Sequence, residues 1–163
     1  MLKWPMQKKF SSKILIFSWI LTSVLMIQTA EARTFFGRTI QLPVQKIAPG
    51  TGQISINLLL PENHQFVKEA PSTIFIRTKH AELLKAPHAR PEPLDLFKLP
   101  YTFDYSAQPG QTVAVIDIKA HFCDKVSKIC LVDFIRVKFP IQIEADAPSD
   151  FQLRIPLKSK TAS

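Results

Sequence analysis

The stretch TVAVIDIKAHFCDKVSKICLVDFIRVKFPIQI, residues 112–143, decides the fold of this chain of 163 residues. In residues 112–122 apolar side chains recur at every second position, and the same alternation returns in residues 135–143. A period of two is the pattern of a β-strand with one buried and one solvent-facing side. Because only a short segment separates the two runs, the sequence predicts two strands joined by a short loop.

The rest of the chain shows the strand pattern in shorter pieces. Alternating or β-rich runs occupy residues 53–60, 72–79, 101–105 and 151–157. Since such runs have one apolar and one polar side, the sequence predicts an antiparallel β-sandwich. The 13 Pro of the chain argue against a long helical bundle, because an interior Pro costs about 3 kcal/mol in a helix.

Proline also marks the interruptions in this pattern. Pro140 lies inside a strand run, which predicts an edge position or a bulge there. The one helical candidate, residues 81–85, is cut short by Pro87. The Pro-rich segment from there to Pro100 is expected to be an extended loop that crosses the sandwich.

The N-terminus carries the pattern of an export signal. Four Lys precede an almost wholly apolar run at residues 14–27, and Ala30-Glu31-Ala32 gives a small-x-small cleavage pattern. That run spans about 21 Å as a helix, less than the roughly 30 Å of bilayer hydrocarbon, which favours a cleaved signal over an uncleaved anchor. We therefore expect a signal peptide at residues 1–32 and one β-sandwich domain at residues 33–163. The protein would be periplasmic or secreted, with no stable membrane anchor after cleavage.

The charge and motif content of the expected mature chain bound its chemistry. Without residues 1–32, 17 of the 21 basic and 12 of the 13 acidic side chains remain, a net charge of +5. The basic residues are dispersed and no exposed aromatic platform accompanies them, so no nucleic-acid partner is predicted. There is no Gly-rich phosphate loop, no H-E-x-x-H and no G-x-S-x-G. Two Cys and four scattered His lack the spacing of a zinc site, so no cofactor or metal is expected.

Cys123 and Cys130 are the most informative residues of the chain. In an exported protein an even pair of Cys predicts a disulfide, and facing strands bring Cα atoms to about 4.5–5.5 Å, within bonding range. Neither Cys is in phase with the apolar row of its strand, so the sulfurs are accessible unless a loop covers them. Two roles remain open. The bond could be a structural staple worth about 2.5 kcal/mol, which spacing and phase alone favour. It could instead be a redox pair whose thiolate is stabilised by the nearby His121, Lys125 and Lys128, with Asp124 opposing them.

Three segments together resemble the N-terminal domain of the thiol:disulfide interchange protein DsbD. They are LPENHQFVKEAPS at residues 60–72, the cysteine hairpin from Phe122 to Val132, and Phe139-Pro140-Ile141. The resemblance covers about residues 53–157. A related β-sandwich forms the C-terminal domain of proteins that carry thioredoxin and NHL-repeat domains. This chain departs from the family in a cysteine spacing one residue longer, and in Leu131-Val132-Asp133 where the family has an aromatic-Pro-Pro sequence.

The resemblance implies an immunoglobulin-like sandwich that passes electrons by thiol–disulfide exchange. Carried over to this chain, Cys123 and Cys130 form the redox pair, which is attacked through a mixed disulfide. The implied partners are thioredoxin-like or other redox proteins. The alternative is a non-catalytic periplasmic binding or assembly module in which the same disulfide is only structural. Which of the two cysteines a partner attacks stays open at this point.

Overall fold

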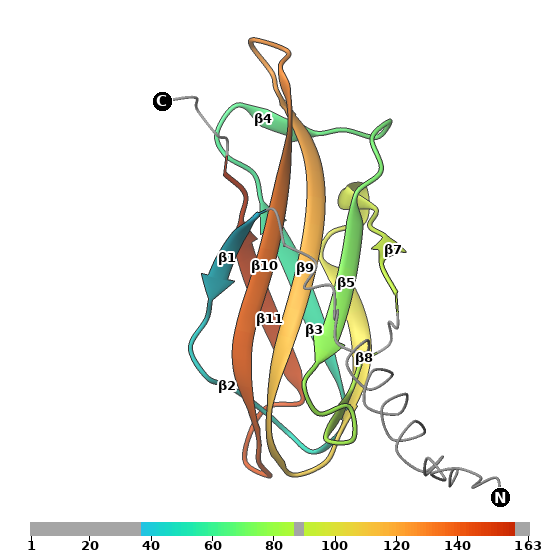
Figure 1. The fold of residues 1–163 in the computed structure, drawn as a ribbon, viewed down its shortest axis with the longest axis vertical. Helices are drawn as coiled ribbons and strands as arrows, with labels where there is room; N and C mark the ends of the chain where they lie inside the picture. Colours follow the sequence, from blue (N-terminus) through green and yellow to red (C-terminus); the bar gives the residue numbers. More distant parts are fainter. Residues whose placement is uncertain (1–36, 87–89, 159–163) are drawn as a thin grey trace, which may run out of the picture. The chain divides into compact units, whose positions relative to one another are not determined.

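A computed structural model describes residues 37–86 and 90–158 as two β-sheets packed face to face (Figure 1). The all-β sandwich predicted from the sequence is confirmed. The predicted signal peptide, residues 1–32, lies outside the described residues. Among the residues that are described, no helix is long and apolar enough to cross a membrane.

The strands are β1 (Arg38–Gln41), β2 (Gln45–Ile47), β3 (Gly50–Leu59), β4 (His64–Phe66), β5 (Thr73–Thr78), β6 (Leu84–Lys85), β7 (Glu92–Pro93), β8 (Tyr101–Ala107), β9 (Gly110–Asp124), β10 (Cys130–Ile143) and β11 (Asp150–Pro156). A short 3-10 helix, η2 (Leu96–Lys98), precedes β8. Each of the longer predicted strand runs corresponds to one observed strand. The short strands β1, β2, β4, β6 and β7 have no counterpart among the predictions.

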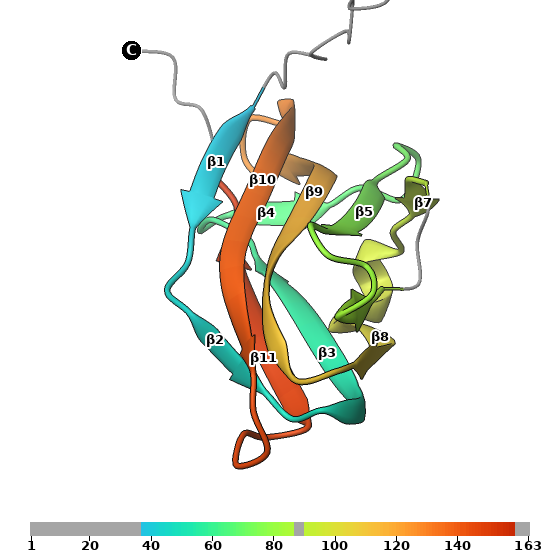
Figure 2. The same cartoon turned by 60° about the horizontal axis from the view of Figure 1, so that its bottom comes forward.

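The two sheets are mixed, whereas the sequence predicts a purely antiparallel sandwich. The first sheet has the order β1-β10-β9-β5-β7, with β2 also paired to β10 and β4 to β9; the second has the order β11-β3-β8-β6. β1 and β2 run parallel to β10, and β11 runs parallel to β3. Figure 2 shows β1 and β2 following one another along the outer side of β10. These strands join sheet edges through crossing connections rather than hairpins, so the chain does not reverse direction beside its partner.

The β9–β10 hairpin is the longest element and carries the largest share of the core. Every residue of β10 faces a residue of β9, and the tip of the hairpin extends beyond the neighbouring strands at the top of Figure 1. Its inward row includes Ile116, Phe122 and Val137, all with no exposed surface. This row packs with Ile56 and Ile155 of the opposite sheet in one hydrophobic cluster. The alternation in residues 112–143 is therefore the core face of the first sheet.

Pro140 lies inside β10 without a bulge, at a point where the outer side of β10 has no strand partner, so of the two predicted situations the edge position is confirmed and the bulge is not found. It faces Val113 in an unbroken register with β9. Asp124, the last residue of β9, forms a hydrogen-bonded pair with Ile129. Because such pairs alternate along the ladder, the Pro140–Val113 pair is a non-hydrogen-bonded one, and the nitrogen of Pro140 points away from β9. On that side β1 ends at Gln41 and β2 begins at Gln45. The N–H that proline lacks is thus not needed, because the outer strand is interrupted there.

The helical prediction for residues 81–85 is wrong. The segment is a turn in which the amides of Leu83 and Leu84 donate to the carbonyl of His80, followed by β6. Five residues are too few to stabilise a helix, and the burial of Leu84 against β8 favours the strand. From β6 in the second sheet the chain passes to β7 in the first and returns to β8 in the second. The predicted crossing of the sandwich is confirmed.

Asp133 connects the two sheets beside the hairpin. Its carboxylate, on the inward face of β10, accepts hydrogen bonds from Arg38 of β1 and from the backbone amide of Lys158, which follows β11. The Arg38 guanidinium also donates to the carbonyl of Pro156 in β11. Asp133 is only 8 % exposed, so this polar group is buried with its partners in place. The sheets are therefore joined by side chains that the disulfide does not involve.

Candidate functional site

Cys123 and Cys130 form a disulfide across the end of the hairpin, as predicted. The S–S distance is 2.01 Å and the two Cα atoms lie 3.9 Å apart, closer than the expected 4.5–5.5 Å. The amide of Asp124 donates to the carbonyl of Ile129 at 2.9 Å, which makes the adjacent Cys123–Cys130 pair a non-hydrogen-bonded one. In an antiparallel ladder facing residues approach most closely at such pairs. The cross-strand register alone therefore brings the sulfurs together.

The two cysteines differ in exposure. Cys123 is only 8 % exposed, because β4 runs beside it and places Gln65 opposite it in the sheet. Cys130 is exposed, since among the described residues no strand pairs with the other side of β10 before Ile135. The Sγ of Cys130 lies 3.8 Å from the carbonyl oxygen of Lys128. The disulfide thus presents one of its residues to solvent and keeps the other within the sheet.

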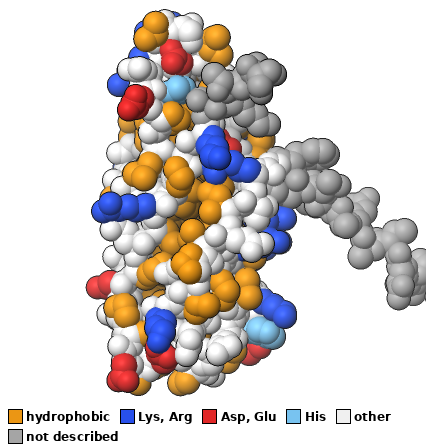
Figure 3. Space-filling view, turned by 90° about the vertical axis from the view of Figure 1, so that its left-hand side faces the viewer, with side chains coloured by type: hydrophobic (Ala, Val, Ile, Leu, Met, Phe, Trp, Pro, Cys, Tyr) orange, Lys and Arg blue, Asp and Glu red, His pale blue; other side chains and the backbone are white. Residues whose placement is uncertain are grey.

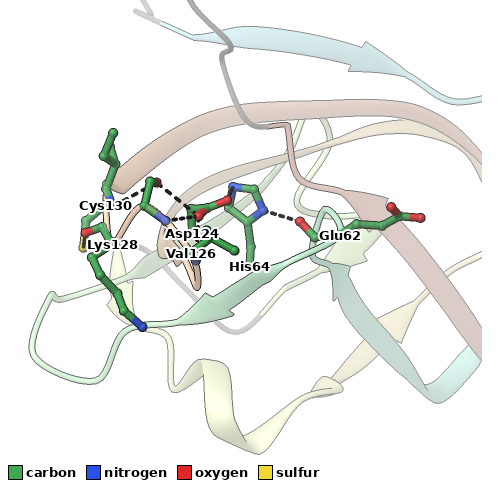
Figure 4. A network of polar contacts seen from close by, with 8 residues as sticks. Glu62, His64, Asp124, Val126, Lys128 and Cys130 are labelled. Atoms are coloured by element: carbon green, nitrogen blue, oxygen red, sulfur yellow. Dashed lines mark hydrogen bonds and ion pairs between the residues drawn. The ribbon is translucent and has the colours of Figure 1, made fainter.

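The carboxylate of Asp124 fixes the turn between the two cysteines. It accepts hydrogen bonds from the amides of Val126 and Ser127, at 2.8 and 2.7 Å, and from the Ser127 hydroxyl at 3.1 Å (Figure 4). Hydrogen bonds from the Ser127 and Val126 amides hold the pKa of Asp124 below its usual value. Lys128 closes the turn with a positive φ of 60°. The tip is therefore an ordered turn held by one acidic side chain.

His64 of β4 supports the hairpin from below the tip. Its Nδ1 lies 2.6 Å from the carbonyl oxygen of Glu62, so this nitrogen carries the hydrogen and donates it (Figure 4). Its Nε2 lies 4.0 Å from the carboxylate of Asp124. The imidazole also meets the Phe122 ring edge-on, with centroids 5.4 Å apart. These contacts join residues 60–72, one of the segments behind the family resemblance, to the base of the cysteine turn.

The cationic residues expected near the sulfurs fall into two groups. Lys125 and Lys128 are exposed in the turn. His121 lies two residues before Cys123 on the same face of β9, and its Nδ1 is buried without a hydrogen-bond partner among the described residues. Burial, and then the nearby Lys119, lower the pKa of His121, which keeps its ring neutral near neutral pH. Only the two lysines therefore bring positive charge to the turn.

Two apolar side chains at the tip were missed by the sequence reasoning. Val126 is 80 % exposed and Ile129 is 61 % exposed, although both lie in a loop of otherwise polar residues. Farther along β10, Val132 and Phe134 also remain exposed on the outer face. The available signal was the presence of two large aliphatic residues inside a six-residue loop. Such side chains in a turn have no core to enter, so they are accessible for contact with another molecule.

No metal site accompanies the cysteines: within the described residues no three His, Cys, Asp or Glu side chains come together as a group that could hold an ion. A scan against models of protein families finds no match for this chain, and a search of curated proteins finds none either.

Proposed function

We propose that this chain is an exported β-sandwich that takes part in thiol–disulfide exchange through Cys123 and Cys130, with a thioredoxin-like protein as partner. The observation that carries the proposal is the unequal exposure of the pair. Cys130 is exposed at the open side of β10, while Cys123 is only 8 % exposed between β10 and β4. An incoming thiolate therefore reaches the disulfide at Cys130.

The exchange then proceeds in two balanced steps. A partner thiolate attacks Sγ of Cys130, forms a mixed disulfide with it, and displaces Cys123 as a thiolate, which takes up a proton from water. The second cysteine thiolate of the partner then attacks the partner's sulfur in the mixed disulfide, forms a disulfide within the partner, and releases Cys130 as a thiolate, which is protonated by water. The partner loses two electrons and the Cys123–Cys130 pair gains them. In the opposite direction the thiolate of Cys130 attacks a partner disulfide, and Cys123 resolves the intermediate.

The position of the bond supports an exchange role over a purely structural one. The disulfide lies within a single hairpin whose strands already pair along their full length, and the turn inside it is held by Asp124. The link between the sheets runs instead through Asp133 and Arg38. Opening the S–S bond would therefore leave the sandwich and its core intact, as repeated cycles of reduction and oxidation require.

A pair of single variants tests this function. Cys123→Ser leaves the exposed Cys130 as the free thiol, and Cys130→Ser leaves the buried Cys123. Each variant is mixed with a thioredoxin that keeps only its attacking cysteine, activated as a disulfide with thionitrobenzoate, so that thionitrobenzoate leaves and the mixed disulfide is followed by mass spectrometry. We expect Cys123→Ser to form the adduct, and Cys130→Ser to form it about tenfold more slowly or not at all. Equal rates for the two variants, or no adduct with either one, would contradict the proposal.

The alternative is a binding module that uses the disulfide as a staple, and the ordered tip favours it as a second candidate. Both the S–S bond and the Asp124 turn hold Val126 and Ile129 in an exposed position. Under this alternative the double variant Cys123→Ser/Cys130→Ser loses thermal stability but keeps partner binding. The wild-type disulfide would then stay oxidised when a reduced thioredoxin is added under native conditions, and that result separates the two functions.

A further inference from the structure

The hairpin tip combines apolar and basic side chains around the accessible cysteine. We define the tip surface as Lys125, Val126, Lys128, Ile129 and Cys130, all of which are exposed. Val126, at 80 %, is the most exposed large apolar side chain of the described residues, and Ile129 is 61 % exposed. Figure 3 shows apolar and basic side chains at the top end of the molecule, where the hairpin ends, with acidic side chains just below them. Cys130 is thus part of a mixed apolar and cationic surface.

The turn that carries this surface has a net positive charge, because residues 124–130 contain two lysines and one acidic residue. Neither Lys125 nor Lys128 forms an ion pair with a side chain in the described part of the chain. The one acidic residue of the turn, Asp124, directs its carboxylate at the amides of Val126 and Ser127. The carboxylate therefore forms no ion pair with either lysine, and both ammonium groups can pair with an incoming molecule.

The tip surface is also ordered before any partner arrives. Besides the disulfide, the amide of Lys125 donates to the carbonyl of Asn63 at 2.7 Å, and the amide of Lys128 donates to the carbonyl of Asp124 at 3.1 Å. A surface that is already ordered loses less conformational entropy on association than a flexible loop does. The end of the hairpin extends beyond the neighbouring strands (Figure 1), so a partner can approach it from that end.

We infer that the tip surface docks the exchange partner, and that this partner carries an apolar patch rimmed by acidic groups around its reactive cysteine. The inference rests on the proposed function and adds the chemistry by which a partner is selected. Val126 and Ile129 fill the apolar patch, and the two lysines pair with the acidic rim. Docking in this way brings the thiolate of the partner to Cys130. The two lysines attract both this thiolate and the acidic groups that surround it on the partner, so these negative charges can approach the tip together.

Short cysteine peptides of defined chemistry test the inference. The probes are Asp-Val-Cys-Val-Asp, Lys-Val-Cys-Val-Lys and Asp-Ser-Cys-Ser-Asp, which separate the acidic from the apolar requirement. The observable is the second-order rate of opening of the Cys123–Cys130 disulfide in the native protein, divided by the measured thiolate fraction of each peptide. We expect the acidic apolar peptide to react about tenfold faster than the basic one at low salt, and the difference to shrink at high salt.

Variants with matched controls assign the effect to the tip. Lys125→Glu/Lys128→Glu reverses the preference between the acidic and the basic peptide, whereas Lys85→Glu/Lys138→Glu, with the same change in charge elsewhere, keeps it. Val126→Ser/Ile129→Ser removes the advantage of the Val peptide over the Ser peptide. The control Val44→Ser/Leu59→Ser, which changes two other exposed apolar residues, keeps that advantage.

Dithiothreitol, a small uncharged dithiol, separates failure of this inference from failure of the proposed function. If dithiothreitol opens the native disulfide and the three peptides react at equal rates per thiolate, the function stands and the inference is overturned. If the lysine variants leave the peptide preference unchanged, the inference is overturned as well. If no thiol opens the disulfide without unfolding the protein, the proposed function fails and the inference fails with it.

Discussion

Nη2 of Arg38 lies 2.9 Å from the carboxylate of Asp133, and this pair connects the edge strand β1 with the central strand β10. The same guanidinium donates to the carbonyl of Pro156 in the opposite sheet. The pair therefore joins both sheets beside the hairpin that carries the disulfide. Because the sheets are joined here and the S–S bond lies within one hairpin, the bond does not link the sheets, and we expect the fold to persist when it is opened.

The first prediction concerns this contact. Asp133→Ala leaves the Arg38 guanidinium and the Lys158 amide without their acceptor, so we expect a loss of about 2 kcal/mol in the free energy of unfolding. Urea unfolding measures it, with Asp146→Ala, which removes an exposed carboxylate from a turn, as the matched control. Equal stabilities of the two variants would show that the Arg38–Asp133 pair does not hold the sheets.

The second prediction concerns the fold without the disulfide. In Cys123→Ser/Cys130→Ser the strands of the hairpin still pair and Asp124 still holds the turn, so the far-ultraviolet circular dichroism should match that of the wild type. The free energy of unfolding should fall by no more than about 2.5 kcal/mol, which is the stabilisation expected when a disulfide of this loop length restricts the unfolded chain. Unfolding of the double variant at room temperature would contradict this view and favour a structural role for the bond.

The third prediction concerns pH. The folded state lowers the pKa of His121 below 6.5, so in acid the unfolded chain takes up this proton more readily than the folded one. The stability contributed by neutral His121 is present above pH 6.5 and is lost as the pH falls through the lowered pKa. Urea unfolding at several pH values across this range should show that the free energy of unfolding falls less on acidification for His121→Gln than for the wild type. If the free energy of unfolding falls equally for the two proteins, the loss of stability in acid arises from other titratable groups.

The fourth prediction concerns processing. When the full chain is produced with its secretion pathway intact, we expect cleavage after Ala32 and a mature protein that begins at Arg33. Mass spectrometry of the intact protein from the periplasmic fraction gives the N-terminus directly. Ala32→Lys, which removes the small residue before the cleavage point, should leave the signal attached. A chain that keeps Met1 in the wild type would instead indicate an uncleaved anchor.

The sequence was most informative where the structure is local. Alternation in residues 112–143 identified the hairpin, because the period of two depends only on which face of each strand is buried. The disulfide was also predictable from local sequence, because Cys123 and Cys130 lie on either side of one short loop between two strand patterns. Both features arise within one stretch of chain, so no knowledge of distant partners was needed.

The features that set the chemistry of the site depend on distant segments, and the sequence did not reveal them. Cys130 is exposed because β1 first pairs with β10 at Ile135, and Cys123 is covered because β4 runs beside it. Arg38 meets Asp133 across 95 residues of chain. Short strands such as β1 and β4 carry too few residues for a visible alternation, so their pairing cannot be read from periodicity.

The reduction potential of the Cys123–Cys130 pair tests the central claim most directly. The native protein is equilibrated with dithiothreitol buffers of known ratio, and the oxidised fraction is measured after acid quenching and thiol alkylation. The account predicts a potential above about −300 mV, within reach of thioredoxin-like partners, with the fold retained in the reduced state. A potential below about −300 mV would contradict it and identify the disulfide as a structural one.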